Sequence, residues 1–456
     1  MYIINKSSKI PIYQQLYLEL KKDIITDYKP NQKLPSIRKL ASLYNISKNS
    51  VQKAYMQLEI EGFIEAREKL GYFVNELNYK EFKPKTTQQT TPKQKEYKFD
   101  FFPAHLENKT FAHKIWKRLY NKVINEQTNF GHYPHGQGEL ALRVEIAKYL
   151  QKSRGANVSA ENIIITHGFV DSLNLVAKLL KSHSNHFATE LPGYHIAHKI
   201  FSEFGYKVSF VEVNHDGIDI QKLKETKAKI VYITPSHQYP LGINMPIQKR
   251  LELIDYISSI DGIILEDDYD SELRYDTQPI PSLQGLDTNQ SVIYLGTFAK
   301  ALSPAIRVGF MVLPDRVLKL YKNHYDSHFC HVSIDTQKTL TAFIKEGHFE
   351  RQIRKVRNLN RKKHDHMLKE LKQLRKCKIV AKNGGLAIII TATIPFDYQK
   401  LQELCEEEGI KIYLLKERSG SDFEAVRMGF GGLSIDEISV ATKIFIKVWN
   451  KIVSSS

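Results

Sequence analysis

The chain has 456 residues, 42% of them hydrophobic, with a formal net charge of +16 and a pI of about 9.3. This length predicts about three domains, or one small domain and one large two-lobed unit, and the charge favours an acidic partner, nucleic acid first. No apolar run approaches the roughly 18 residues of a membrane span. The N-terminus lacks a signal peptide's apolar segment, and Cys330, Cys377 and Cys405 form no CxxC pair. We therefore expect a cytosolic protein with no membrane partner, no disulfide framework and no metal site.

The first 75 residues predict three short helices and a hairpin. Apolar side chains recur every third or fourth position between Ile12 and Ile24, which gives the first helix one apolar face. Ser36 and Ser47 are the predicted N-caps of the next two helices, and Asn45 tolerates the left-handed turn between them. Two helices joined by so short a turn are typical of a helix-turn-helix, whose second helix enters the major groove.

The hairpin, residues 63–74 with a polar tip around Lys69, would be the wing of such a domain. A helical oligomerisation or cap domain with a charged, solvated face is the alternative. In the DNA-binding interpretation, the residues at the start of the third helix that face bases and phosphates are Ser47, Lys48, Asn49, Ser50 and Gln52.

Composition divides the rest of the chain. Residues 76–98 are rich in Thr, Gln, Lys and Pro, which is typical of a flexible linker. From residue 99 to 456, apolar runs such as Ile263–Leu265 alternate with helical patterns. This alternation predicts an α/β domain with a mostly parallel sheet covered on both faces.

Several candidate site residues follow predicted strands of that sheet. Gly168 comes after the strand 162–166 and opens a helix, whose free N–H groups would suit a phosphate; an ordinary βα turn is the alternative. Tyr194 offers a ring that could stack on a planar ligand, or it packs in the core.

Later predicted strands, 262–265 and 291–295, lead to the residues with the clearest chemistry. Asp267 could hold a pyridine nitrogen protonated, Tyr269 could donate to a ring oxygen, Lys300 could form an imine, and Arg307 could bind an anion. Taken singly, the acids could be solvated loop charge or a cation site, and the lysine could be surface charge. Together they lie at strand ends, where open α/β sheets bind ligands, and they predict a pyridoxal phosphate site.

The N-terminal motifs resemble the winged helix of the GntR family. The order of a helix, LPS-x-R-x-LA, Ser-Lys-Asn-Ser-Val, EGF and a wing covers nearly all of residues 10–75. The resemblance implies that Arg38, Lys48 and Lys69 contact DNA from the helix before the turn, the recognition helix and the wing. Lys48 stands where many members have Arg, which replaces a bidentate guanine contact with a point charge.

Over about residues 10–450 the chain resembles the MocR subfamily of GntR regulators, which joins such a winged helix to a fold-type I aminotransferase-like domain. The stretches that carry the resemblance are TPSHQYPLG (234–242), EDDYDSELRYD (266–276), GTFAKALSPAIRVG (296–309) and VRMGF (426–430). The resemblance implies a homodimer, a pyridoxal phosphate cofactor and a smaller C-terminal α+β lobe at about 350–456.

The resemblance also assigns roles by position. It makes Lys300 the Schiff-base lysine, Asp267 the pyridinium partner, Tyr269 the partner of the phenolic oxygen and Tyr194 the stacking ring. The arginines that match those handling an effector's charge are Arg307 and Arg427.

Some positions depart from the family pattern. Ala299 replaces a serine that helps bind phosphate, and Phe169-Val170 after Gly168 removes a side-chain phosphate contact, which leaves backbone amides, Ser303 and Thr297. His195 and His198 stand near Tyr194, where some members use an Arg for a substrate carboxylate.

Three functions stay open at this point. The preferred hypothesis is a transcriptional regulator that senses pyridoxal phosphate and controls vitamin B6 synthesis, or one that responds to an amine or amino acid or controls efflux. The second is a working aminotransferase with an accessory DNA-binding domain. The third is a regulator whose large domain is a dimerisation scaffold without cofactor.

Overall fold

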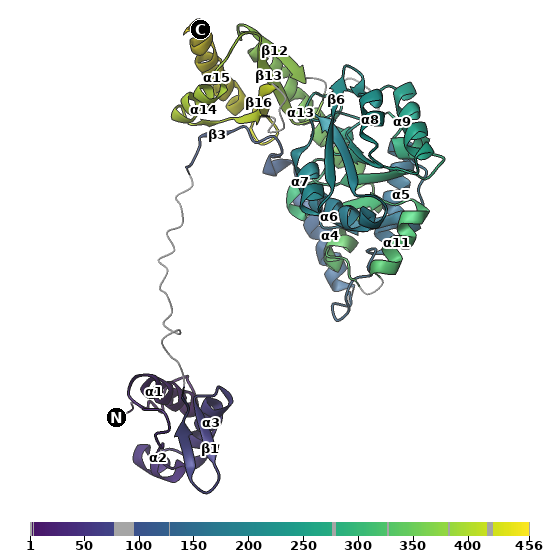
Figure 1. The fold of residues 1–456 in the computed structure, drawn as a ribbon. Coiled ribbons are helices and arrows are strands. Elements are labelled where there is room, and N and C mark those ends of the chain that lie inside the picture. The colour runs from purple at the N-terminus through teal and green to yellow at the C-terminus, as the bar shows by residue number, and fades with distance from the viewer. Residues whose placement is uncertain are drawn as a thin grey trace. The chain divides into compact units, whose positions relative to one another are not determined.

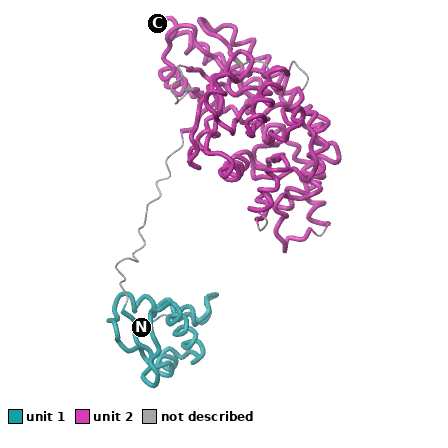
Figure 2. Tube along the Cα trace, turned by 45° about the vertical axis from the view of Figure 1, so that its right-hand side comes forward, with its two compact units in different colours: residues 1–94 teal, residues 95–456 magenta. Residues whose placement is uncertain are grey.

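The computed structural model describes residues 2, 4–76, 95–126, 128–275, 280–325, 328–381, 384–416 and 423–455. Its internal contacts divide the chain into two compact units, residues 1–94 and 95–456 (Figure 2), which we call the head and the core domain. Residues 77–94, most of the predicted linker at 76–98, lie outside the described residues.

The head consists of three helices followed by an antiparallel hairpin (Figure 1). Its elements are α1 Ile12–Thr26, α2 Ile37–Tyr44, α3 Lys48–Ile60, β1 Ile64–Arg67 and β2 Gly71–Val74. Ser36 caps α2 by accepting from Lys39 N at 3.2 Å, and Ser47 caps α3 by accepting from Ser50 N at 3.1 Å. Asn45 adopts the left-handed conformation with φ 49°. The predicted caps and turn are confirmed.

One apolar cluster holds the head together. Leu16 and Leu20 of α1 are fully buried against Val51 and Tyr55 of α3, and burial stabilises a large apolar side chain by roughly 1.5–3 kcal/mol. The Tyr55 hydroxyl donates to Pro35 O at 2.7 Å, which ties α3 to the start of α2. The two helices of the helix-turn-helix are therefore fixed relative to each other.

The core domain is built on an eight-stranded sheet in the order β4-β11-β10-β9-β8-β5-β6-β7. Strands β10, β9, β8, β5 and β6 are parallel neighbours, whereas β11 and β7 run antiparallel to theirs. The strands are β4 Ile163–Thr166, β5 His186–Leu191, β6 Lys207–Asn214, β7 Gly217–Ile218, β8 Ile230–Ile233, β9 Ile263–Asp268, β10 Val292–Thr297 and β11 Gly309–Val312. The predicted α/β class with a mostly parallel sheet is confirmed.

Helices cover both faces of this sheet. Successive residues of a strand point to opposite faces, so a run of consecutive apolar residues is buried only if helices pack on each side. Ile163 and Ile165 pack with α5 and α12, while Ile164 packs with α6, α7 and α11. The helices of this part are α4 His113–Asn125, α5 Leu140–Arg154, α6 Phe169–Leu179, α7 His195–Glu203, α8 Ile220–Thr226, α9 Ile247–Ser259, α10 Leu283–Leu286, α11 Asp315–Tyr325 and α12 Ile334–Lys345. Short 3-10 turns occur at Asn108–Thr110, Ala160–Asn162, Leu180–Ser182, Ser271–Leu273 and Pro304–Ile306.

The small lobe has its own antiparallel sheet, in the order β12-β13-β16-β15, with helices packed against it. Its elements are α13 His348–Leu371, β12 Cys377–Ala381, β13 Ala387–Ala392, α14 Tyr398–Glu407, β14 Ile410–Lys411, β15 Tyr413–Lys416, β16 Glu424–Gly429 and α15 Ile435–Ser455. The first strand of the core domain, β3 at Phe99–Asp100, pairs in parallel with β14. Phe99 and Phe101 are buried in this lobe's core, so the small lobe also contains the residues that follow the linker.

Candidate functional site

The site is built at the carboxyl edge of the large sheet, around Lys300. Lys300 lies three residues after β10, and only 14% of its side chain is exposed. Its Nζ is 3.8 Å from Asp270 Oδ2 and 4.2 Å from the centroid of the Tyr269 ring. Burial lowers the pKa of Lys300, and the charge of Arg427 lowers it further against the opposing effect of Asp270. A larger fraction of the amine is therefore neutral and able to attack a carbonyl carbon.

Asp267 lies within β9 rather than beyond its end, because that strand continues to Asp268. Its Oδ2 accepts a hydrogen bond from the Tyr232 hydroxyl of the neighbouring strand β8. Its Oδ1 is buried and has no hydrogen-bond partner among the described residues. Burial raises the pKa of Asp267 well above its ordinary value. An N–H or cationic group of a ligand would give this buried oxygen the partner that it lacks.

The buried Asp270 and the partly buried His237 form a pair beside Lys300. Asp270 Oδ2 is 2.9 Å from His237 Nδ1, and the Tyr269 hydroxyl is 3.3 Å from the same nitrogen. Burial would raise the pKa of Asp270, but His237 and Lys300 outweigh it and hold the pKa below its ordinary value. Asp270 is thus an anion next to the amine. Neither it nor His237 was predicted, although both lie in stretches with recognisable motifs.

At the end of the site that is suited to a phosphate, the N-terminus of α6 lies against the guanidinium of Arg307. Gly168 is the N-cap of α6 with φ 82°, and a Cβ there would lie 2.8 Å from Arg307 Nη2. Arg307 therefore rests against the backbone where α6 begins, near Phe169 and Val170. A helix N-terminus with an adjacent arginine favours a phosphate.

Two further predicted residues border this end of the site. The Tyr194 ring meets the Phe169 ring edge-on at 5.9 Å and the Tyr239 ring at 5.4 Å. Burial, and then the charge of Asp267, raise the pKa of Tyr194. Thr297 ends β10, and its Oγ1 accepts from Ala299 N at 3.2 Å.

Arg427 approaches the site from strand β16 of the small lobe. Its Nη1 donates to the Tyr239 hydroxyl at 2.8 Å, and its guanidinium sits 4.7 Å from the centroid of that ring. A narrow cavity brings Arg427 together with Lys300, Asp270 and residues of β13. Arg307 thus lies against the start of α6, and Arg427 lines the cavity that also contains Lys300.

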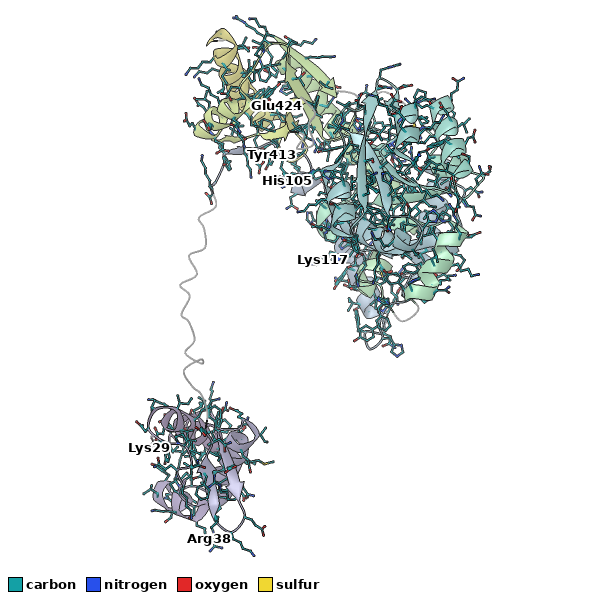
Figure 3. The ribbon with its side chains drawn as sticks, in the orientation of Figure 1. Lys29, Arg38, His105, Lys117, Tyr413 and Glu424 are labelled. Atoms are coloured by element: carbon teal, nitrogen blue, oxygen red, sulfur yellow. The ribbon has the colours of Figure 1, made fainter. Side chains whose placement is uncertain are left out.

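The head presents its predicted DNA-contacting residues as a separate group. Arg38 lies exposed on α2, at the surface of the head (Figure 3), and Lys69 is exposed at the hairpin turn with φ 60°. Ser47 and Ser50 are hydrogen-bonded to each other at 2.9 Å across the start of α3. The exposed side chains at that start are Ser47, Lys48, Asn49 and Gln52.

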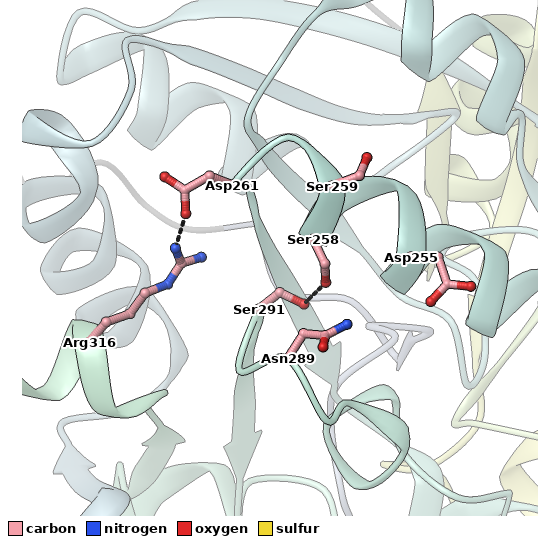
Figure 4. A pocket seen from close by; sticks show the side chains of 7 residues that line it. All are labelled: Asp255, Ser258, Ser259, Asp261, Asn289, Ser291 and Arg316. Atoms are coloured by element: carbon pink, nitrogen blue, oxygen red, sulfur yellow. Dashed lines mark hydrogen bonds and ion pairs between the residues drawn. The ribbon is translucent and has the colours of Figure 1, made fainter.

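A larger polar hollow lies at the opposite edge of the sheet, where β9 and β10 begin (Figure 4). Arg316 and Asp261 form an ion pair there, and Ser258 donates to Ser291 at 3.1 Å. Its charged groups, Asp255, Asp261 and Arg316, are exposed, and it is open to solvent. Nothing in it matches the chemistry gathered around Lys300.

Comparisons with known proteins agree with this division into head and core. Residues 12–74 match the model of the bacterial regulatory proteins of the gntR family, and residues 103–431 match aminotransferase class I and II, a family that binds pyridoxal phosphate. No helix among the described residues is long and apolar enough to cross a bilayer.

Relatives match most or nearly all of the chain. The uncharacterized HTH-type transcriptional regulator YdeL of Bacillus subtilis is 34% identical over 98% of both chains. The probable rhizopine catabolism regulatory protein MocR of Rhizobium meliloti is 30% identical, covering 79% of this chain and 77% of its own. The pyridoxine biosynthesis regulator PdxR of Corynebacterium glutamicum is 28% identical, covering 81% and 80%.

Solved structures support the fold of the core domain. The multiple substrate aminotransferase from Thermococcus profundus matches with a TM-score of 0.71 at 20% identity, covering 80% of this chain and 94% of its own. The α-aminoadipate aminotransferase LysN from Thermus thermophilus matches with a TM-score of 0.70 at 23% identity, covering 78% and 93%. At these identities the likeness establishes the fold alone.

Proposed function

Because this chain belongs to the MocR subfamily of GntR-type transcriptional regulators, which carry an aminotransferase class I and II domain, we propose that it senses pyridoxal phosphate and adjusts its binding to promoter DNA accordingly. The observation that carries the proposal is that two residues with the required chemistry occur at one sheet edge. The pKa of Lys300 is lowered, and Oδ1 of Asp267 is buried and has no hydrogen-bond partner among the described residues. A plain aminotransferase needs no winged helix, whereas a sensor needs both parts.

The described residues fit the cofactor. When bound, pyridoxal phosphate supplies an aldehyde that condenses with a primary amine and releases water, and a pyridine ring whose protonated nitrogen pairs with a carboxylate. Lys300 would provide the amine and Asp267 the carboxylate, while Tyr269 would donate to the ring oxygen and Tyr194 would stack on the ring. The residues that would hold the phosphate are Gly168, Phe169, Val170, Thr297 and Arg307.

The signal we favour is pyridoxal phosphate itself, with vitamin B6 synthesis as the regulated process. PdxR, named for pyridoxine biosynthesis, is among the relatives of this chain, and histidines at 195 and 198 stand where an arginine would bind a substrate carboxylate. An amine or amino acid, such as a GABA-like effector, is the alternative signal. Arg427 beside Lys300 would bind the carboxylate of such an effector, and control of efflux genes would also fit.

We infer that cofactor binding affects DNA binding through a rearrangement of the small lobe. A Cβ at Gly385 would lie 2.9 Å from Asp270 Oδ2, so the segment before β13 packs directly against the acid beside Lys300. Once Lys300 is covalently engaged, Asp270 faces a different charge distribution, and the packing of this segment changes with it. A ligand shifts such an equilibrium only through its different affinity for the two states.

The protein would work in the cytoplasm as a homodimer. Promoter DNA is found there, and a winged helix reads two half-sites most simply when two heads act together. The homodimer would bring two heads to one operator, and cofactor occupancy would alter how well both bind at once.

The visible absorbance of purified protein tests cofactor binding. We expect a titration with pyridoxal phosphate to produce a saturable visible band in the wild type. The band should be absent in Lys300→Ala and retained in Lys199→Ala, which removes an exposed lysine of α7. Bands of equal strength in all three proteins would mean that the reaction occurs at surface amines.

An active aminotransferase is the second candidate, favoured by the lowered pKa of Lys300. Steady-state transamination with a panel of amino donors and 2-oxo acids separates the two. A sensor is expected to show turnover far below that of enzymes, for which roughly 1–1000 per second is usual. Rapid turnover together with no DNA binding would assign the chain to the enzymes.

A further inference from the structure

The positive charge of the core domain is concentrated in one segment. Residues 99–456 contain 48 Lys and Arg against 40 Asp and Glu, a surplus of eight. The stretch from Arg351 to Lys378 alone contains twelve Lys and Arg against two Asp and Glu, a surplus of ten. Most of this stretch is helix α13. Without it, the remainder of the core domain would be slightly acidic.

The exposed basic residues of α13 fall on one side of the helix. Val356, Met367 and Leu371 are buried on its inner side. At 3.6 residues per turn the exposed basic positions fall within an arc of about 120° and extend over about 27 Å. These residues are Arg351, Arg354, Lys355, Arg361, Lys362 and Lys369, and we call them the α13 basic face.

Half of this basic face lacks an acidic neighbour among the residues that the structure describes. Among the described residues, no acid lies within ion-pair distance of Arg354, Lys362 or Lys369. Arg361 lies 3.8 Å from Asp365, but both side chains are more than half exposed, and such pairs contribute little. The face therefore stays strongly positive.

Helix stability does not account for the arrangement. Like charges three or four residues apart, as at Arg351, Arg354 and Lys355, destabilise a helix by about 0.2–0.5 kcal/mol per pair. Arg351 and Arg354 also stand near the helix start, where the backbone dipole favours negative charge. A surface that keeps such a pattern is better explained by an anionic partner.

We propose that the α13 basic face binds the phosphate backbone of the DNA that flanks the operator. Duplex DNA carries one negative charge per about 1.7 Å, so a 27 Å face spans a row of phosphates within one helical turn. Lysine and arginine contacts to phosphates position a protein without reading sequence. The inference rests on the DNA-binding role of the head.

Because the linker tethers the core domain to the head, even a weak contact between the α13 basic face and DNA can raise the overall affinity. Nineteen Cα-to-Cα steps separate Glu76 from Lys95, so covalent geometry keeps these two residues within about 70 Å of each other. With the head on its operator, the core domain stays close to the flanking duplex. A second contact on the same chain then acts at a high effective concentration and can raise overall affinity by about 10²–10⁴.

The test uses full-length protein and two duplexes. The operator sequence is first selected from a random-sequence pool by the wild type. One duplex ends at the operator, and the other continues for roughly 20 bp of arbitrary sequence on each side, which covers the reach of the linker. The test variant is Arg354→Gln/Lys362→Gln/Lys369→Gln. The control, Lys199→Gln/Lys319→Gln/Lys322→Gln, removes the same charge from α7 and α11, and thermal unfolding verifies that both fold.

We expect the wild type to bind the long duplex more tightly and with a steeper salt dependence than the short one. The test variant should lose about tenfold or more in affinity for the long duplex and about 2–3 in the slope of log K against log salt. It should bind the short duplex like the wild type, and the control should match the wild type on both.

Equal wild-type affinities and slopes for the two duplexes would overturn the inference while leaving the head's function intact. Equal losses in the test variant and the control would also overturn it, since net charge alone would then explain the effect. Binding to phosphatidylserine vesicles that only the test variant loses, with unchanged DNA binding, would assign the face to lipid headgroups instead. Failure of every protein to bind either duplex would contradict the proposed function itself.

Discussion

The hydroxyl of Tyr413 donates a hydrogen bond of 2.9 Å to Oδ1 of Asp100, the last residue of β3. Tyr413, labelled in Figure 3, is at the same time the register partner of Arg427 in the neighbouring strand β16. The strand pair that carries Arg427 is therefore one hydrogen bond away from the residues that follow the linker. Rearrangement of the small lobe at the ligand site would reach the linker along this path.

Tyr413→Phe is expected to uncouple cofactor binding from DNA binding. The substitution removes the hydrogen bond to Asp100 but keeps the ring, so the affinity for pyridoxal phosphate should stay within about twofold of the wild type. The effect of the cofactor on operator affinity should shrink by about 0.5–1.5 kcal/mol, the net contribution of one hydrogen bond. Operator titrations with and without cofactor measure this difference.

Tyr398→Phe is the matched control, because Tyr398 accepts a small-lobe backbone hydrogen bond from Ala392 N at 2.8 Å. It should retain the full cofactor effect. If Tyr413→Phe also retained it, the path through Asp100 would carry no signal.

Replacing each of two adjacent acids of β9 by asparagine should affect different properties of the protein: cofactor affinity for Asp267 and stability for Asp268. Among the described residues Asp267 has no ion-pair partner, whereas Asp268 Oδ2 lies 2.8 Å from Arg154 Nε, with both side chains almost fully buried. Asp267→Asn should weaken pyridoxal phosphate binding about 10- to 100-fold, the value of a hydrogen bond to a charged group, and leave stability unchanged or higher. Asp268→Asn leaves Arg154 uncompensated and should cost about 3–5 kcal/mol of stability.

Absorbance titration and thermal unfolding of both variants distinguish these effects. A large fall in the melting temperature of cofactor-free Asp267→Asn would show that this carboxylate holds the fold and is not reserved for a ligand.

Glu190 of β5 should make the cofactor-free protein less stable as pH rises. Burial raises the pKa of Glu190 to about 7 from an ordinary value of 4.5, against hydrogen bonds from Thr234 that lower it. The folded state then binds this proton more tightly than the unfolded state. The stabilisation is present below the unfolded pKa and is lost as pH rises towards the folded pKa, by up to about 3 kcal/mol.

Glu190→Gln should therefore flatten the fall in melting temperature between about pH 5 and pH 7. Glu212→Gln, which changes an exposed acid on the neighbouring strand β6, should reproduce the wild-type profile. Parallel profiles for all three proteins would show that Glu190 titrates normally.

Lys48 should contribute to operator binding through a phosphate and not through a base. Lys48 is exposed at the first turn of α3. Lys48→Ala should lower affinity for all sequences alike and reduce the salt slope by about 1. Lys22→Ala, on the outer side of α1, should change neither. A loss confined to one base position of the operator would instead make Lys48 a base-reading residue.

The parts of the fold that depend on local sequence patterns could be predicted from the sequence. The caps at Ser36 and Ser47 and the left-handed Asn45 follow from short-range backbone chemistry, and each was predictable. The strand that contains Asp267 and the strand that precedes Lys300 are recognisable as buried apolar runs. Their shared sheet edge then followed from parallel topology.

Contacts set by long-range pairing were not predictable. Tyr232 resembles an ordinary core aromatic, and its hydroxyl reaches Asp267 only because β8 and β9 are parallel neighbours in a fixed register. The pairing of Phe99–Asp100 with Ile410–Lys411 joins segments more than 300 residues apart. No local pattern in either segment indicates the other.

The operator affinity of the full-length protein with and without pyridoxal phosphate tests the central claim most directly. A coupling of about 1–3 kcal/mol predicts that saturating cofactor changes the wild-type affinity by roughly 5- to 150-fold. Lys300→Ala should bind the operator with one affinity under both conditions. Wild-type affinities that coincide with and without the cofactor, in a protein that binds it at Lys300, would contradict the claim that this site reports to the DNA-binding head.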